Sequence, residues 1–246
     1  VLLPAEMVER MPVKGVISRN LLLASLGARD RALLADSLAP VDLPVETVLE
    51  EANKPIENVY FLESGIASVV AGAGDLIEVG LIGREGMTGL SIVMGDDRSV
   101  NRTFVQGTGS ALRMSAKNLG LAMDKSKTLR LGLLRYAQVF AVQVAQTALS
   151  NGRDKIEARL ARWLLMAHDR FDRNDFPFTH HFLALMLGVR RPGVTTTLHV
   201  LEGNGLIKAR RGLITVINRK GLEVRARRSY GVPEAEYDRL IGRPAS

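Results

Sequence analysis

Side chains that can read the edges of nucleic-acid bases gather between residues 190 and 196. Arg190 and Arg191 carry guanidinium groups, and Thr195 and Thr196 carry hydroxyls about one helical turn further along. In the major groove an arginine can donate two parallel hydrogen bonds to guanine, and a threonine can serve bases of either kind. The sequence therefore predicts base contacts by these four residues. An ordinary solvated helix surface is the alternative explanation.

Two short helices separated by a tight turn are predicted to hold these side chains. Thr179 is a good N-cap for a helix over residues 180–187. A Gly-Val turn follows, and Pro192 suits the first turn of a second helix. Three apolar residues at helical spacing would bury the second helix against the first: Val194, Leu198 and Leu201.

A basic hairpin is predicted after the second helix, which the glycines at 203 and 205 end. Two short β-like runs cover residues 206–208 and 213–216, with two arginines and a glycine between them. Helix, turn, helix and hairpin in this order make a winged helix-turn-helix. Basic and hydroxyl groups at its edge would contact phosphates, which position a protein without reading sequence. The predicted backbone contacts are Thr179, Thr197, His199, Lys208, Arg210 and Arg211.

Residues 41–114 have a different character. Short apolar runs such as 59–62 and 66–70 alternate with glycines that mark corners. Many short strands at close spacing indicate a small antiparallel barrel or sandwich. Ahead of this region, leucines at helical spacing predict one helix over residues 20–39, which Pro40 ends.

A long helix is predicted over residues 127–150, a segment with one glycine and no proline. A helix that is apolar on two faces must be covered on two sides. One broad face holds Leu131, Leu134, Gln138, Ala141, Ala145 and Ala148. Another holds Leu133, Tyr136, Phe140, Val144 and Thr147. One side would cover the barrel, and the other, rich in alanine and valine, would approach a second copy of the chain closely. A helix buried within a monomer is the alternative.

Asn151 and Gly152 are expected to end the long helix, because glycine suits the left-handed position after a helix. A further helix is predicted over residues 153–171. The tail, residues 229–246, is left without a role; packing on the C-terminal domain and mobility are both open for it.

Composition excludes several classes of function. Cysteine is absent, which removes disulfides, cysteine-ligated zinc and thiol redox chemistry. All four histidines follow residue 150, so the N-terminal part lacks imidazole ligands for a metal or haem. No nucleophile elbow, metal-ligand spacing or phosphate loop is present, and we expect no enzyme. The absence of a secretory or membrane-spanning pattern predicts a cytoplasmic protein with no membrane partner.

Residues 1–150 are near neutral, and residues 151–246 hold most of the net charge of +7, as expected for a sensor joined to a nucleic-acid reader.

The chain resembles the Crp/Fnr family of transcriptional regulators. The similarity runs through FLALMLGVRRPGVTTTLHVLEGNGLI and the following RGLITVINRKGLE. It implies an α+β protein in three units: a cyclic-nucleotide-binding-like antiparallel β-roll of the double-stranded β-helix type with flanking helices (1–126), a dimerisation helix (127–150) and a winged helix-turn-helix DNA-binding domain (151–246). The resemblance implies a homodimer on a palindromic double-stranded DNA operator, with RNA polymerase as a possible partner. It further implies that a change in the roll alters how the two long helices pack.

Two departures from the family's pattern bear on function. On the recognition helix Arg191 matches the first Arg of the best-known branch, which implies a guanine contact. Pro192 and Thr196 stand where that branch has Glu and a later Arg, so its operator is not expected. In the cyclic-nucleotide cassette, Thr88-Gly89-Leu90 replaces Gly-Glu-Leu and lacks the carboxylate for the ribose. The second element survives as Arg102-Thr103. The candidate effector contacts are Gly89, Leu90, Arg102 and Thr103, with a cyclic nucleotide as the implied cofactor.

Alternatives stay open at this point. Arg102 is alternatively a surface residue on a roll kept for packing and dimerisation. The whole chain is alternatively a small-molecule sensor whose helix-turn-helix is degenerate or binds a protein. The outward basic and hydroxyl residues of the second helix count against that alternative.

Overall fold

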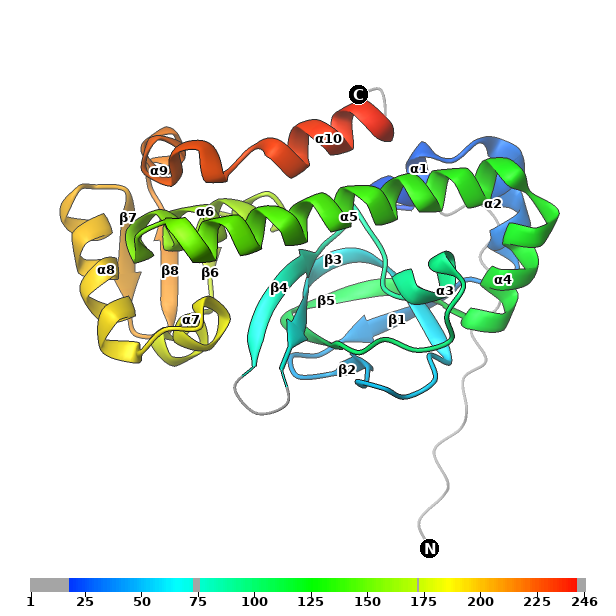
Figure 1. Cartoon of the computed structure of the whole chain (residues 1–246), viewed down its shortest axis with the longest axis horizontal. Helices are drawn as coiled ribbons and strands as arrows, with labels where there is room; N and C mark the ends of the chain where they lie inside the picture. The colour runs from blue at the N-terminus through cyan, green and yellow to red at the C-terminus, as the bar shows by residue number, and fades with distance from the viewer. Residues whose placement is uncertain (1–17, 73–75, 172, 243–246) are drawn as a thin grey trace, which may run out of the picture.

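The computed structural model describes residues 18–72, 76–171 and 173–242. The segment Val1–Arg10, which shows no secretory pattern, and the last four residues of the tail lie outside these ranges. Figure 1 shows one long helix running past a β-roll at one end of its length and a helix-rich region at the other. We call residues 18–126 the N-terminal region and residues 154–242 the C-terminal region.

The N-terminal region contains an antiparallel sheet in the strand order β1-β5-β3-β4, with β2 paired to β5. Its strands are β1 (Ala39–Leu43), β2 (Val48–Glu50), β3 (Asn58–Ala71), β4 (Ile77–Ile82) and β5 (Arg102–Ser115). The two 14-residue strands bend together where Gly65 of β3 meets Gly109 of β5. A Cβ on Gly109 would lie 2.0 Å from the carbonyl oxygen of Ser64, so only glycine allows this approach. The predicted antiparallel β-roll is confirmed.

Four short helices flank the roll: α1 (Leu21–Ser25), α2 (Ala28–Ala35), α3 (Leu90–Met94) and α4 (Ala116–Lys125). The single helix predicted over residues 20–39 is wrong. Leu26 adopts an extended backbone between α1 and α2, and the chain has already entered β1 at Ala39. Asn20 fixes the start of α1, because its buried amide donates to the carbonyl oxygens of Leu62 and Gly86.

The long helix α5 (Lys127–Arg153) starts where predicted, capped by Ser126, but continues through Asn151 and Gly152. The predicted break at that pair is wrong, because Asp154 supplies the end instead. Its backbone N–H donates to the carbonyl of Ser150, and its carboxylate accepts from the Ser150 hydroxyl at 2.7 Å. A glycine in the last turn costs only about 1 kcal/mol in helix propensity.

The C-terminal region begins with α6 (Ile156–His168), shorter than the predicted 153–171. A three-stranded sheet follows in the order β6-β8-β7. After α6 the strands and α-helices follow in the order β6 (Asp175–Phe176), α7 (His180–Leu187), α8 (Arg191–Gly203), β7 (Ile207–Arg210), β8 (Leu213–Val216), α9 (Arg219–Ala226) and α10 (Val232–Leu240). The order of a winged helix-turn-helix is therefore confirmed.

The tail has a defined place. Helix α10 packs along α5, and Tyr237 is buried in the core of the N-terminal region. Packing on the C-terminal domain is confirmed for the start of the tail, where Tyr230 packs against the core of that domain and its hydroxyl donates to Asp169 at 2.7 Å. Helix α10 then returns to the other half of the molecule (Figure 1).

A shared core joins the two regions. Ile66, Val70 and Leu81 of the roll belong to the same buried cluster as α6, α7 and α8. No helix within the described ranges is long and apolar enough to cross a membrane. The described residues also contain no cluster of three potential metal ligands.

Candidate nucleic-acid interface

Helices α7 and α8 form the helix-turn-helix through a glycine turn. Thr179 caps α7, accepting a hydrogen bond from the backbone N–H of Phe182 at 3.1 Å, as predicted. Gly188 adopts a left-handed backbone at the end of α7, which lets the chain reverse into α8. Val194, Leu198 and Leu201 are buried, as their spacing predicted. Helix α8 is thus held by its apolar face with its other face free.

The exposed face of α8 carries most of the side chains proposed for base contact. Arg190 and Arg191 are exposed at the start of the helix, and His199 is exposed further along the same helix. Side chains near the N-terminus of a recognition helix are those that reach base edges in helix-turn-helix complexes. Arg190 and Arg191 therefore have the position that the predicted contacts require. Thr196 is also exposed, and its base contact stays a prediction.

Thr195 is partly buried, and its hydroxyl is already engaged. It donates to the carbonyl of Arg191 at 3.2 Å and lies 3.0 Å from Nδ1 of His180. Burial and the nearby charges of Arg191 and His199 lower the pKa of His180, so the ring is neutral near pH 7 and can donate from Nδ1. A base contact by Thr195 would use its remaining lone pair, and this contact stays a prediction.

Thr197 does not belong to the surface, and its predicted phosphate contact is wrong. Its side chain is 3% exposed, and its hydroxyl donates to the carbonyl of Gly193 at 2.8 Å. Thr197 follows Val194 by three residues and precedes Leu201 by four, which puts it on the buried face of the helix.

The wing places three cations beside α8. Lys208 and Arg210 on β7 and Arg211 in the turn that follows are on the outside of the hairpin. The hairpin is tied to α8 because the backbone N–H of Ala209 donates to the carboxylate of Glu202 at 2.9 Å. This bond fixes the basic tip relative to the recognition helix. The phosphate contacts proposed for these cations, and for Thr179 and His199, stay predictions.

Two of the candidate effector residues, Gly89 and Thr103, already use their hydrogen-bond donors on Glu50. The Glu50 carboxylate is 8% exposed and accepts from the Gly89 backbone N–H and the Thr103 hydroxyl, both at 2.5 Å. Leu90 is the first residue of α3 and is partly buried. Arg102 lies 3.6 Å from the Glu51 carboxylate, with its guanidinium over the Phe104 ring. An internal carboxylate thus accepts from one residue of the element that the resemblance assigns to the ribose, Gly89, and from one of the element that it assigns to the cyclic phosphate, Thr103.

Sequence reasoning missed a buried link between the two regions. The Glu78 carboxylate on β4 accepts from the indole N–H of Trp163 on α6 at 2.6 Å and from the Ser68 hydroxyl at 2.5 Å. Burial raises the pKa of Glu78 to about 7, against the lowering effect of both hydrogen bonds and of Arg162 and Arg170. The one signal in the sequence was an acidic residue inside an otherwise apolar run.

Comparisons with known proteins agree with this architecture. Residues 158–225 match the Crp-like helix-turn-helix domain family. No curated protein sequence matches the chain. The fold is similar to FixK2 from Bradyrhizobium japonicum, with a TM-score of 0.67 and 15% identity over 77% of this chain and 98% of that one.

Two further solved structures are similar. A Crp-family transcriptional regulator from Thermus thermophilus gives a TM-score of 0.62 and 19% identity, over 76% of this chain and 96% of that one. The c-di-GMP-responsive regulator CLP from Xanthomonas campestris gives a TM-score of 0.59 and 17% identity, over 77% of this chain and 99% of that one. This chain therefore carries a Crp-like helix-turn-helix domain on the fold of Crp/Fnr-type transcriptional regulators.

Proposed function

We propose that this protein is a homodimeric, sequence-specific DNA-binding regulator of transcription. The observation that carries the proposal is the surface formed by α8 and the wing. Its five cations have no carboxylate partner among the described residues: Arg190, Arg191, Lys208, Arg210 and Arg211. Unpaired cations around a helix that can enter the major groove suit DNA, because phosphate contacts release counterions and strengthen binding. A degenerate helix-turn-helix would have no reason to keep this surface.

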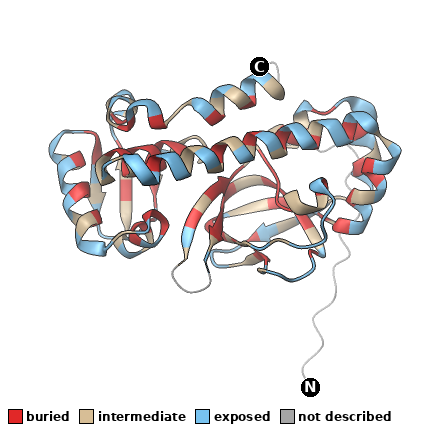
Figure 2. Ribbon diagram, in the orientation of Figure 1, coloured by how far each residue is buried: buried red, intermediate tan, exposed pale blue. Residues whose placement is uncertain are grey.

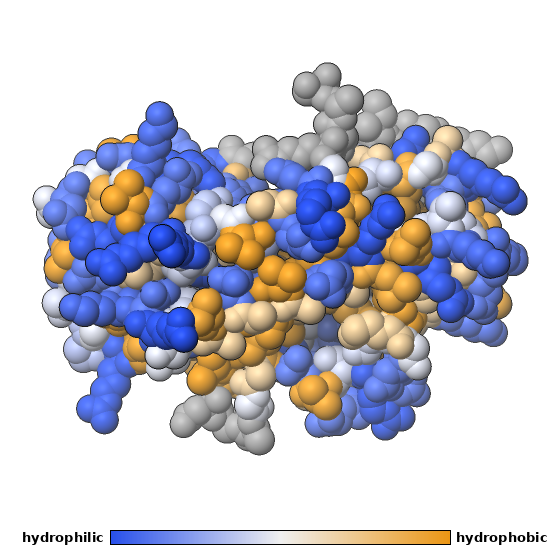
Figure 3. Space-filling model, turned by 45° about the horizontal axis from the view of Figure 1, so that its top comes forward, coloured by the Kyte–Doolittle hydropathy of each residue, from blue (hydrophilic) through white to orange (hydrophobic). Residues whose placement is uncertain are grey.

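The exposed face of α5 supports a dimer. Leu131 and Leu134 are 49% and 39% exposed, and Gln138, Ala141, Ala145 and Ala148 continue the stripe. Figure 2 shows the exposed residues alternating with buried ones along α5, and Figure 3 shows apolar surface across the middle of the molecule between more hydrophilic ends. An exposed apolar stripe of this length marks an interaction surface. Its alanines permit close approach of another helix, which favours packing against the same stripe of a second copy of the chain.

The dimer gives the expected geometry on DNA. Two symmetry-related recognition helices suit a palindromic operator with half-sites about 34 Å apart. We keep the division into a β-roll sensor, a dimerisation helix and a DNA-binding domain, with residues 127–153 now forming the helix. A cytoplasmic location, a contact with RNA polymerase and the lack of an enzymatic activity are part of the proposal.

Selection of bound sequences from a random duplex pool tests the proposal. At fixed moderate salt we expect a palindromic motif, with a linear fall of the logarithm of affinity against the logarithm of salt concentration. Enrichment of no motif, with or without salt-dependent binding, would refute sequence-specific recognition.

Arg191→Ala should lower affinity for the selected operator about 10- to 100-fold, because it removes a side chain proposed to bond guanine. The matched control is Arg211→Ala, which should weaken operator and random duplex equally and reduce the salt slope by about one. Fluorescence anisotropy on both duplexes measures the four affinities. Equal losses on both duplexes for Arg191→Ala would show that Arg191 contacts phosphate rather than a base.

Cyclic AMP and cyclic GMP should not bind the isolated protein. The phosphate of either would have to displace or face the Glu50 carboxylate, which already takes the donors of Gly89 and Thr103. Isothermal titration calorimetry should give no saturable heat up to millimolar nucleotide. Saturable binding that Arg102→Ala abolishes would restore the cyclic-nucleotide effector.

A further inference from the structure

The chain connects the two halves of the molecule twice. We call residues 156–230, from α6 to the turn before α10, the winged-helix body. It is joined to α5 by Asp154 and Lys155, which both have extended backbones between two helices. The chain leaves the body again at Gly231 and enters α10, which packs along α5 (Figure 1). Helix α10 lies beyond residue 225, where the match to the Crp-like helix-turn-helix domain ends.

The start of α10 is held by the winged-helix body. Tyr230 packs against the core of the body, and its hydroxyl donates to Asp169 at 2.7 Å. The carbonyl oxygen of Ser229 accepts from the buried guanidinium of Arg162 at 2.8 Å. The chain is thus fixed to α6, and to the residue that ends α6, directly before α10 begins.

The far end of α10 is held by the N-terminal half of the molecule. Tyr237 is 7% exposed and belongs to the buried core that the roll shares with α1, α4 and α5. Leu240 and Ile241 pack against the same core. A helix of nine residues therefore links the winged-helix body to a core on the other side of the α5–α6 joint.

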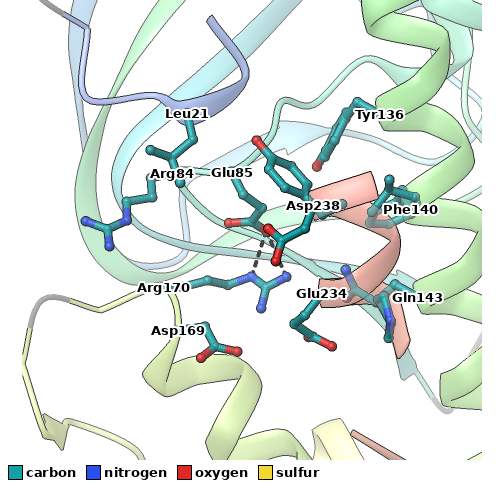
Figure 4. Close-up of a pocket in the computed structure, with 13 residues that line it drawn as sticks. Leu21, Arg84, Glu85, Tyr136, Phe140, Gln143, Asp169, Arg170, Glu234 and Asp238 are labelled. Carbon is teal, nitrogen blue, oxygen red and sulfur yellow. Dashed lines mark hydrogen bonds and ion pairs between the residues drawn. The ribbon is translucent and has the colours of Figure 1, made fainter. Parts of the chain in front are cut away.

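Charges from both halves meet where α10 crosses between them. Arg170, which follows α6, donates to Glu85 of the N-terminal region at 2.8 Å. Figure 4 shows this pair joined by dashed lines, with Glu234 of α10 beside Arg170. Burial raises the pKa of Glu234, and the positive charges of Arg170 and Arg162 act against that rise. Docked α10 therefore lies beside an ion pair that links the same two halves.

Gly231 has the properties of a hinge at the start of α10. Its φ is +104°, a left-handed backbone that other residues rarely adopt, and a Cβ built there would meet no atom within 4 Å. The glycine is therefore needed for its backbone conformation and not for close packing. Only this residue separates the anchored Tyr230 from Val232, the first residue of α10, so the chain between them spans at most about 7 Å.

Two attachment points restrict how the winged-helix body can turn. With α10 docked, the body is tied at the α5–α6 joint and again at Gly231, which leaves only a rotation about the line between these points. The contact of α7 with β4 opposes that rotation. With α10 released, the covalent connection through Asp154 and Lys155 is the one that remains.

We propose that α10 is a strap that locks the winged-helix body at one orientation on the roll, and that release of α10 frees the body to turn about the α5–α6 joint. A nine-residue helix is too short to be stable alone in water, so α10 should unfold when it leaves α5. Release is then a local opening that leaves the roll and the body folded. The lock is independent of DNA, and only its effect on operator affinity rests on the proposed function.

Distances between two spin labels test the lock in the absence of DNA. The chain has no cysteine, so Lys117→Cys on α4 and Lys220→Cys on α9 provide the labelling sites, and both positions are exposed. Dilution with unlabelled chains restricts the measurement to distances within one chain. We expect a single narrow distance distribution with the strap intact. Tyr237→Asp, which puts a carboxylate into an apolar core, should widen it at least twofold.

Two further chains complete this experiment. Ala235→Asp introduces the same residue at an exposed position of α10 and should keep the narrow distribution. A chain that ends at Tyr230 lacks α10 and should give the wide distribution. A narrow distribution in both the shortened chain and Tyr237→Asp would show that other contacts fix the body, and would overturn the proposal.

Hydrogen–deuterium exchange of the unaltered chain tests release without any substitution. The backbone amides of α10 should exchange together, and at least tenfold faster than those of α6 and α9, because the strap leaves while these helices stay folded. Exchange of α10 as slow as that of α6 would mean that it leaves only when the protein unfolds, and would overturn the strap.

Operator affinity measures the effect of the lock on DNA binding. Tyr237→Asp should bind the selected operator at least tenfold more weakly than the unaltered chain, because fewer molecules hold both recognition helices in the orientation that two half-sites require. Its affinity for random duplex should not change, and Ala235→Asp should bind both duplexes normally. Equal operator affinity in Tyr237→Asp would refute control of DNA binding by the strap. If no operator is selected at all, the proposed function fails, and the label distances and exchange rates still decide the strap.

Discussion

Ala145→Glu on α5 should convert the protein into a monomer and reduce its affinity for a palindromic operator at least 100-fold. Ala145 lies on the exposed stripe of α5 between Ala141 and Ala148. In the proposed dimer the new carboxylate would be buried against a second copy, near its own symmetry mate, and an unpaired buried charge strongly opposes association. In a dimer, binding of one DNA-binding domain holds the second at high effective concentration near the other half-site. Two separate monomers lose this gain in affinity, which is a factor of about 10² to 10⁴.

Analytical ultracentrifugation gives the oligomeric state, and anisotropy gives the operator affinity. The matched control is Leu121→Glu, which puts the same charge at an exposed position on α4, away from the stripe. We expect this control to remain a dimer with unchanged affinity. A dimeric Ala145→Glu variant would show that another surface joins the two copies.

Local patterns were sufficient to predict the helix-turn-helix. The bounds of α7 agree with residues 180–187, because a cap, a short apolar run and a glycine determine both ends within the segment itself. The existence of α5 likewise follows from helical periodicity over 27 residues. Thr197 differs from the predicted surface position, because its spacing of three residues from Val194 and four from Leu201 puts it on the buried face of α8.

The other features of the fold and of the candidate sites depend on contacts between distant parts of the chain, which local patterns do not reveal. Asn20 starts α1 by bonding carbonyls of residues 62 and 86, and nothing near Asn20 in the sequence signals those partners. Glu50 reaches Gly89 and Thr103, so the state of the effector cassette depends on a residue outside it. Helix α10 packs along α5, an arrangement for which the tail's composition gives no pattern.

Glu78→Gln should stabilise the protein at pH 8 by up to about 3 kcal/mol and leave its stability at pH 4 nearly unchanged, since one pKa unit corresponds to about 1.4 kcal/mol. Burial raises the pKa of Glu78 to about 7 from the ordinary value of 4.5. The folded state therefore binds more protons than the unfolded state between these two pKa values. The contribution of this group to stability is fully present below pH 4.5 and is lost as pH rises to about 7.

Glutamine has the shape of the protonated acid and can still accept the indole hydrogen bond from Trp163. It cannot ionise, so the variant should lose this part of the pH dependence. Burial also raises the pKa of Glu50 and Glu234, so a smaller slope of the same sign should remain. Urea unfolding at pH 4 and pH 8 measures the difference, and the exposed Glu57→Gln is the control. An unchanged slope in Glu78→Gln would show that Glu78 stays ionised when buried.

The fluorescence of Trp163 should report the deprotonation of Glu78 directly, because the chain contains one tryptophan. The indole N–H of Trp163 on α6 donates to Glu78 on β4. The ring packs against Phe178 and against Phe182 of α7, the first helix of the helix-turn-helix. When Glu78 loses its proton, the charge appears 2.6 Å from the indole nitrogen, which should shift the fluorescence with a midpoint near pH 7. Glu78→Gln should remove that transition. If the transition also changes operator affinity, the buried carboxylate couples proton binding in the roll to the position of the DNA-binding surface.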